Sequence, residues 1–140
     1  MSDITIQHFK PIDGEALAIW NEAWASFVSR GITDNSTVPY PTYHHEAWCA
    51  RVNGVLVGIQ AVIAPPGQPR VSHAISWVKP ENRGQGVWTS ICNVMDADLK
   101  ARGGHEYYIS FVIADEPEML QAVLNRGGVI QQYRTKRPIL

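Results

Sequence analysis

The sequence has few cysteines, no long apolar run and no excess of one charge. Cys49 and Cys92 are its two cysteines, and neither lies in a CxxC or Cys/His spacing. A disulfide framework or a zinc module is therefore not expected, and we expect no metal site. No apolar segment approaches the ~18 residues that span a bilayer. The opening MSDITIQHF lacks the pattern of a signal peptide. We expect no membrane partner, and a reducing cytoplasm as the location.

Charge is nearly balanced, with 12 basic and 13 acidic side chains. This balance gives no electrostatic footprint for nucleic acid, which is not an expected partner. The one basic cluster, YRTKR at 133–137, is interpreted as the solvated face of a strand. Hydrophobic residues make up 45% and charged residues 18% of the chain, which is typical of a globular protein. The length predicts one domain, residues 1–140.

Apolar periodicity and turn residues predict an alternation of strands and helices. Asp13 can cap the first helix, Asn53-Gly54 is a strong hairpin signal, and Pro117 suits the first position of a helix. The predicted elements are a strand at 4–9, a helix from Asp13 to near Gly31, an irregular loop at 31–45, strands at 47–52, 55–63 and 70–78, a helix at 87–101, a strand at 107–113, a helix from Pro117 to Gly127-Gly128, and a strand at 129–140.

Antiparallel hairpins thus lead into one strand–helix–strand unit. This order predicts the α+β class, a mixed sheet with helices packed on its faces.

The loop KPENRGQG, residues 79–86, joins a predicted strand to a predicted helix. Backbone amides in the first turn of a helix lack internal partners, and the helix dipole adds positive charge there. Glycines let a ligand approach the main chain, so Gly84 and Gly86 favour a phosphate cradle, to which Arg83 can add a charged contact. The alternative is a tight turn and nothing more. Neither a Walker A loop nor the dinucleotide fingerprint fits.

Val78-Lys79-Pro80, followed by Arg83, Gly84, Gln85 and Gly86, resembles the signature of the GNAT (GCN5-related) N-acetyltransferases. That signature is a strand ending V-x-P, then Arg/Gln-x-x-Gly-x-Gly/Ala at the start of a helix. The resemblance covers nearly the entire chain. ITIQHFKPIDGEALAIW looks like the first strand and helix of the family, AWCARVNGVLVGIQAVI like its central hairpin, and MLQAVLNRGGVI like its last helix and following strand.

The resemblance implies a GNAT-like acyl-CoA N-acyltransferase fold: a central, mostly antiparallel sheet with helices on both faces and one βαβ cofactor unit. It implies acetyl-CoA as co-substrate and direct transfer of the acetyl group to a primary amine, on a small molecule or a protein. The main chain of Trp77 and Val78 would hold the pantetheine arm and the acetyl carbonyl. The residues implied at the diphosphate are Arg83, Gly84, Gln85, Gly86 and Val87, with Trp88 beside it.

The sequence departs from the family pattern at three positions. Trp88 stands where the family has Gly or Ala, and its indole can join the core, shift the cofactor or close the site. Val123 stands where the family usually has the Tyr that protonates the leaving thiolate, and Glu116 where an Asn often precedes that helix. Tyr108, Tyr133 or a water is the alternative acid.

His73 is the candidate general base, because a pKa near ~6.5 suits proton removal at neutral pH. Strand alternation groups it with the apolar Val71, Ile75 and Trp77, so a buried, hydrogen-bonded histidine is the alternative. Cys49 or Cys92 as a covalent nucleophile is the weaker idea, since neither has a basic partner in sequence.

In the family, the loop before the hairpin borders the acceptor site. Aromatic residues in and just after this loop either line an acceptor pocket or pack the loop on the sheet, and the polar residues that follow it are interpreted as surface groups rather than metal ligands. The aromatic residues are Tyr40, Tyr43 and Trp48, and the polar residues are His44, His45 and Glu46.

A non-catalytic binding or structural protein on the same fold, of which phage-encoded examples resemble this chain, is the rival interpretation. An exposed last strand would also favour pairing with a second copy as a homodimer.

Overall fold

The computed structural model describes residues 3–31, 38–110, 117–131 and 138–139. The chain divides into two compact units, residues 1–110 and residues 111–140. The prediction of one domain stays a prediction. The elements are β1 (Ile4–Phe9), α1 (Gly14–Ser29), β2 (His45–Val52), β3 (Val55–Ile63), β4 (Arg70–Val78), the 3-10 turn η1 (Pro80–Asn82), α2 (Val87–Arg102), β5 (Tyr107–Ile109) and α3 (Pro117–Asn125).

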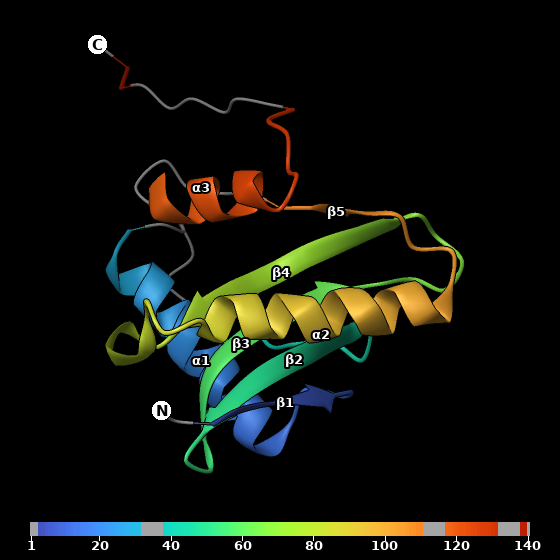
Figure 1. The fold of residues 1–140 in the computed structure, drawn as a ribbon. Helices are drawn as coiled ribbons and strands as arrows, with labels where there is room; N and C mark the ends of the chain where they lie inside the picture. Colours follow the sequence, from blue (N-terminus) through green and yellow to red (C-terminus); the bar gives the residue numbers. More distant parts are fainter. Residues whose placement is uncertain (1–2, 32–37, 111–116, 132–137, 140) are drawn as a thin grey trace. The chain divides into compact units, whose positions relative to one another are not determined.

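The sheet of the first unit has five strands in the order β1-β2-β3-β4-β5 (Figure 1). The first four strands pair antiparallel, while β4 and β5 pair parallel through the crossover helix α2. The predicted class is therefore confirmed: a mixed, mostly antiparallel sheet with one βαβ unit.

Helices cover both faces of this sheet (Figure 1). Ala16, Ile19, Trp20 and Ala23 recur at helical spacing along α1 and are buried in one core cluster with residues of β2, β3 and β4. The buried face of α2 joins a second cluster on the opposite face of the sheet; its residues are Val87, Ile91, Met95 and Leu99.

Gly58 of β3 lets the start of α2 approach the sheet closely. A Cβ at this position would lie 2.9 Å from Cγ1 of Val87 and 3.1 Å from Cδ1 of Ile91. Since interiors are packed too densely to absorb such overlap, a larger residue would push the first turn of α2 outward. Gly58 therefore sets the position of the loop that precedes α2.

A bulge interrupts β4 near its middle. Ala61 pairs with Ile75 whereas Val62 pairs with His73, so the extra residue is Ala74. A bulge shifts the alternation of side chains by one. Consequently Ile75 and Trp77 belong to the cluster under α1, while Val71 belongs to the cluster under α2.

The parallel pairing between β4 and β5 is short. Its register runs from Arg70↔Tyr107 to Ser72↔Ile109 and goes no further within the described residues. The half of β4 that leads to the glycine loop is therefore unpaired with β5 in the part of the chain that the structure describes.

The sequence is interpreted as placing Glu46 on the surface, and the structure shows that this is wrong. Its side chain is fully buried and accepts hydrogen bonds from both terminal guanidinium nitrogens of Arg102. It also lies 2.8 Å from His8 Nε2 and 3.8 Å from Lys10 Nζ. Burial alone would raise the pKa of this carboxyl, but the hydrogen bonds and charges of these partners lower it below its usual value. These contacts of Glu46 link the end of α2 to β1 and β2.

In the second unit, α3 begins at Pro117 as predicted. The helix is followed by two backbone hydrogen bonds: the amide of Gly127 donates to the carbonyl of Leu124, and the amide of Gly128 donates to the carbonyl of Val123. The predicted last strand is not found at residues 129–131 or 138–139, and its remaining positions lie outside the described residues. No helix among the described residues is long and apolar enough to cross a membrane.

Candidate functional site

The loop between β4 and α2 has two glycines in a conformation that other residues resist. The φ angles of Gly84 and Gly86 are +73° and +81°, in the left-handed region. A Cβ added at either glycine would meet nothing within 4 Å, so the space above this loop is open. Backbone conformation, and not crowding by the protein, therefore requires glycine here.

The amides of this loop and of the first turn of α2 point to a ligand-binding function. The helical bonds start with Ser90 N–H donating to Gly86 O at 3.0 Å, as expected where the first amides of a helix have no internal partner. Among the described residues, no acceptor within the protein is found for the amides of Gly84, Gln85, Gly86 and Val87. This segment is exposed up to Gly86, so a diphosphate fits the cradle.

Arg83 is held beside the cradle. The Nε–H of its guanidinium donates to the carbonyl of Val78 at 2.9 Å, which fixes the side chain, while the residue as a whole is exposed. This bond therefore occupies the carbonyl of Val78, which belongs to the main chain that the family resemblance assigns to the pantetheine arm. Trp77 is buried in the cluster under α1, its main chain pairs with Ile59, and its indole N–H has no hydrogen-bond partner among the described residues.

Trp88 turns toward β4 and not across the glycine loop. Its ring is half-buried against the α2 core cluster, and Nε1–H donates to Oγ of Ser76 at 2.9 Å. Of the alternatives left open by the sequence, this packing favours the core position, and whether the ring shifts the cofactor stays a prediction. Because Ser76 lies beyond the part of β4 that pairs with β5 in the described residues, the indole also forms part of the wall beside that strand.

His73 faces α2, whereas simple alternation grouped it with Ile75 and Trp77. That grouping is wrong because the bulge at Ala74 intervenes. The imidazole accepts or donates at both nitrogens, with Nδ1 2.5 Å from Ser110 Oγ and Nε2 3.0 Å from Gln60 Oε1. Burial lowers the pKa of His73 to about 4, against a smaller opposite effect of Asp96, so the expected value near ~6.5 is also wrong.

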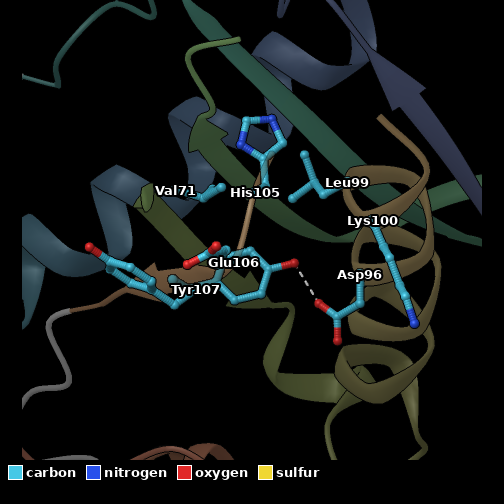
Figure 2. A pocket seen from close by; sticks show the side chains of 8 residues that line it. Val71, Asp96, Leu99, Lys100, His105, Glu106 and Tyr107 are labelled. Carbon is cyan, nitrogen blue, oxygen red and sulfur yellow. Dashed lines mark hydrogen bonds between the residues drawn. The ribbon is translucent and has the colours of Figure 1, made fainter. Parts of the chain in front are cut away.

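Tyr108 stacks on His73 with ring centroids 4.9 Å apart, so the structure brings the two predicted catalytic residues together. Its hydroxyl donates to Asp96 Oδ1 at 2.5 Å (dashed in Figure 2). Whether Tyr108 is the acid stays a prediction, since this proton is already directed to a carboxylate.

The same bond borders an open pocket of about 380 Å³ between α2 and β5 (Figure 2). Its lining includes Asp96, Lys100 and Glu106. Lys100 lies about 20 Å along α2 from the glycine loop, at ~1.5 Å per residue. The pocket is therefore separate from the amide cradle.

The other sequence candidates are dispersed. Cys49 is buried, which raises the pKa of its thiol to about 12 and makes it a poor nucleophile. Trp48 is fully buried and donates to Asp98 at 2.8 Å, so it packs and does not line an acceptor pocket. Tyr40 and Tyr43 are about three-quarters exposed.

Three further positions are connected with the general acid that protonates the leaving thiolate. Val123 lies in α3 in the second unit, while Glu116, Tyr133 and the basic cluster at 133–137 lie outside the described residues. His44 is exposed and His45 half-buried. No group of His, Cys, Asp or Glu within the described residues is arranged to hold a metal ion.

Sequence reasoning missed Gln60, Ser76 and Ser110, which bond to His73 and Trp88. No local pattern could have found them, because their partners lie 12 to 37 residues away in the chain. Together the site offers open amides, a charged arginine and a polar network beneath α2, a set that can bind an anion and move a proton.

No protein-family model matches the sequence, and no curated protein matches it significantly. Solved structures match over nearly the whole chain. An aminoglycoside acetyltransferase from an uncultured soil metagenomic sample, in complex with sisomicin, has a TM-score of 0.71 at 12% identity, over 98% of this chain and 96% of that one. A ribosomal-protein-alanine N-acetyltransferase from Brucella melitensis biovar Abortus 2308 has a TM-score of 0.69 at 16% identity, over 98% and 99%.

A GCN5-related N-acetyltransferase from Ralstonia eutropha JMP134 has a TM-score of 0.68 at 14% identity, over 98% of this chain and 99% of that one. These likenesses show the fold. The chain therefore has the GCN5-related N-acetyltransferase fold that its sequence predicted.

Proposed function

We propose that this protein is an acyl-CoA-dependent N-acyltransferase that moves an acetyl group from acetyl-CoA to a primary amine by direct transfer. The observation that carries the proposal is the row of backbone amides at Gly84, Gln85, Gly86 and Val87, for which the described part of the chain offers no acceptor, at the end of β4 that follows its described pairing with β5. A diphosphate is the common ligand that needs several such amides at a helix start. The likeness in fold to solved acetyltransferases supports the same conclusion.

In this proposal the loop amides and the Arg83 guanidinium bind the diphosphate, and the main chain of Trp77 and Val78 orients the pantetheine arm beside β4. When bound, acetyl-CoA supplies an activated thioester. His73 is neutral at physiological pH because burial lowers its pKa, so it offers a lone pair to a proton but is a weaker base than free imidazole. Tyr108 holds the His73 ring by stacking.

Two experiments test the proposal. Isothermal titration with CoA and acetyl-CoA is expected to give a Kd in the micromolar range, and mass spectrometry is expected to detect acetylation in a panel of small amines and peptide N-termini. Absence of heat at high micromolar CoA would remove the enzyme interpretation. The acceptor, small molecule or protein, the cytoplasmic location and a homodimer stay predictions.

The second candidate is a non-catalytic protein on the same fold. The position of the Trp88 indole on the wall beside β4 favours it, because a ring there narrows the space for a pantetheine arm. Binding of CoA without turnover of any amine in the panel would support this candidate over the first.

A further inference from the structure

Ser110 lies at the outer end of a chain of hydrogen bonds that starts in the core. Its Oγ is 2.5 Å from His73 Nδ1, His73 Nε2 is 3.0 Å from Gln60 Oε1, and Gln60 Nε2 is 2.9 Å from Cys92 Sγ. These side chains come from β3, β4, α2 and the residue after β5. This chain of hydrogen bonds therefore connects four segments that are distant in sequence.

The partners fix the direction of each bond. Gln60 is buried, with 1% of its surface exposed, so both ends of its amide need partners. Because the amide nitrogen donates to Cys92, the amide oxygen accepts, and His73 must carry its proton on Nε2. Nδ1 then presents a lone pair, and the hydroxyl of Ser110 donates to it.

The two ends of the chain differ in exposure. Gln60 is enclosed, whereas Ser110 is exposed, so the hydroxyl oxygen keeps lone pairs available to a bound substrate. Three titratable groups face the imidazole: Asp96 from α2, Tyr108 stacked on the ring from β5, and Cys92 from α2 beyond Gln60. Burial outweighs the Asp96 carboxylate and lowers the pKa of the imidazole, which keeps the ring neutral and makes it a weaker base than free imidazole, so its protonated form is short-lived.

The location also fits a reacting group. The pairing of β4 with β5 reaches Ser72↔Ile109, and Ser110 is the next residue of the chain. Its hydroxyl therefore stands where the pairing of β4 with β5 ends within the described residues, beside the strand along which the proposed function lays the pantetheine arm. An oriented base with a hydroxyl in hydrogen-bond reach is the arrangement expected of a group that handles protons or attacks a carbonyl.

We propose that Ser110 is a catalytic residue of the acyl transfer, the proton carrier between the substrates and His73; this inference rests on the proposed function. As the acceptor nitrogen bonds to the acyl carbon, Ser110 Oγ takes the N–H proton and passes its own proton to His73 Nδ1. The electron pair of the breaking C–S bond stays on sulfur. The His73 imidazolium then returns the proton through Ser110 to that thiolate, so protons balance.

The relay also supplies an acid for the departing thiolate. A thiol has a pKa of ~8.5, so its thiolate is far more basic than the His73 imidazole, and return of the proton is favourable. Val123, which stands where the family usually has the tyrosine acid, has no acidic proton. Ser110 and His73 together therefore account for both proton transfers without a tyrosine.

The test compares Ser110→Ala with Ser110→Thr, which retains a hydroxyl, and with Ser29→Ala, an exposed serine at the end of α1, as control. Ser110→Ala is expected to lower kcat by about 100-fold, in the usual range for general acid–base groups. Its affinity for CoA in isothermal titration should stay unchanged, Ser110→Thr should restore part of kcat, and Ser29→Ala should match the parent protein.

A second readout does not need turnover. Long-range 1H–15N spectra of the free protein are expected to show His73 as the Nε2–H tautomer, with the Nδ1 resonance shifting in Ser110→Ala and returning in Ser110→Thr. An Nδ1–H tautomer would overturn the inference, because His73 would then donate to Ser110.

Three outcomes in the kinetic arm also overturn it: full turnover by Ser110→Ala, loss of CoA affinity in that variant, or an acyl ester on Ser110 in intact-mass spectra. The ester would make Ser110 a covalent nucleophile instead of a carrier. If the parent protein fails to bind CoA, the proposed function fails and the inference with it. If the parent is active and Ser110→Ala is equally active, the inference alone fails.

Discussion

The indole of Trp88 donates a hydrogen bond to the hydroxyl of Ser76, across 2.9 Å from the first turn of α2 to β4. This bond keeps a large ring at the start of a helix from covering the amides of the glycine loop. It also brings the ring to the strand along which the pantetheine arm is proposed to lie. Substitution of Trp88 is therefore the best test of whether the site can bind CoA or is closed to it.

We expect Trp88→Ala to lower the free energy of unfolding by about 2 kcal/mol, because the half-buried ring leaves a partly collapsible space. Its affinity for CoA should stay within about threefold of the parent value, less than the 1.4 kcal/mol of a tenfold change. Chemical denaturation and isothermal titration measure the two effects. A tenfold gain in affinity would contradict this and favour the non-catalytic candidate.

Gly84→Ala and Gly67→Ala form a matched pair. Both glycines have a φ of +73° and open space around a Cβ, so each change should cost about 1 kcal/mol of stability through backbone strain. Gly84 lies in the cradle, while Gly67 lies in the turn between β3 and β4. We expect only Gly84→Ala to weaken CoA binding, by about tenfold, and equal affinities of the two variants would argue against the amide cradle.

Arg83→Gln should reduce the affinity for CoA by about tenfold, since a hydrogen bond to a charged group contributes ~1.5 kcal/mol or more. The remaining affinity should depend less on salt than that of the parent protein. Arg70→Gln, at an exposed position at the start of β4, serves as the control. Identical salt dependence in Arg83→Gln and the parent would contradict a direct contact with the diphosphate.

The free energy of unfolding should fall as the pH is lowered from ~6.5 toward about 4, the folded-state pKa of His73. In this window the unfolded chain binds a proton on His73 and the folded chain does not, so stability rises with pH. His45, whose pKa is also lowered chiefly by burial, adds to the same slope.

Denaturation curves of His73→Asn and His45→Asn across this window measure the two contributions separately. Each variant should give a shallower pH dependence than the parent protein. Glu46 acts at lower pH, because its folded pKa lies below the usual 4.5 and its contribution is lost as the pH falls through that value. An unchanged slope in His73→Asn would show that its imidazole is not shielded from water.

The sequence by itself determined the order of the elements and the place of the glycine loop. Asn53-Gly54 specified the hairpin, and Gly84 with Gly86 specified a turn that only flexible residues adopt easily. Apolar periodicity specified α1 and α2 within one or two residues. These signals are local, since a turn or an amphipathic face depends on residues a few positions apart.

Tertiary structure decided which side chains work together. The bulge at Ala74 moved His73 to the face opposite Ile75, and the short β4–β5 register brought Ser110 to the same edge. Glu46 reads as a polar surface residue until Arg102, 56 residues away, folds onto it. Such contacts depend on strand register and on which segments meet across the sheet. A one-residue shift in β4 moves its side chains to the opposite face of the sheet, and no local sequence pattern signals that shift.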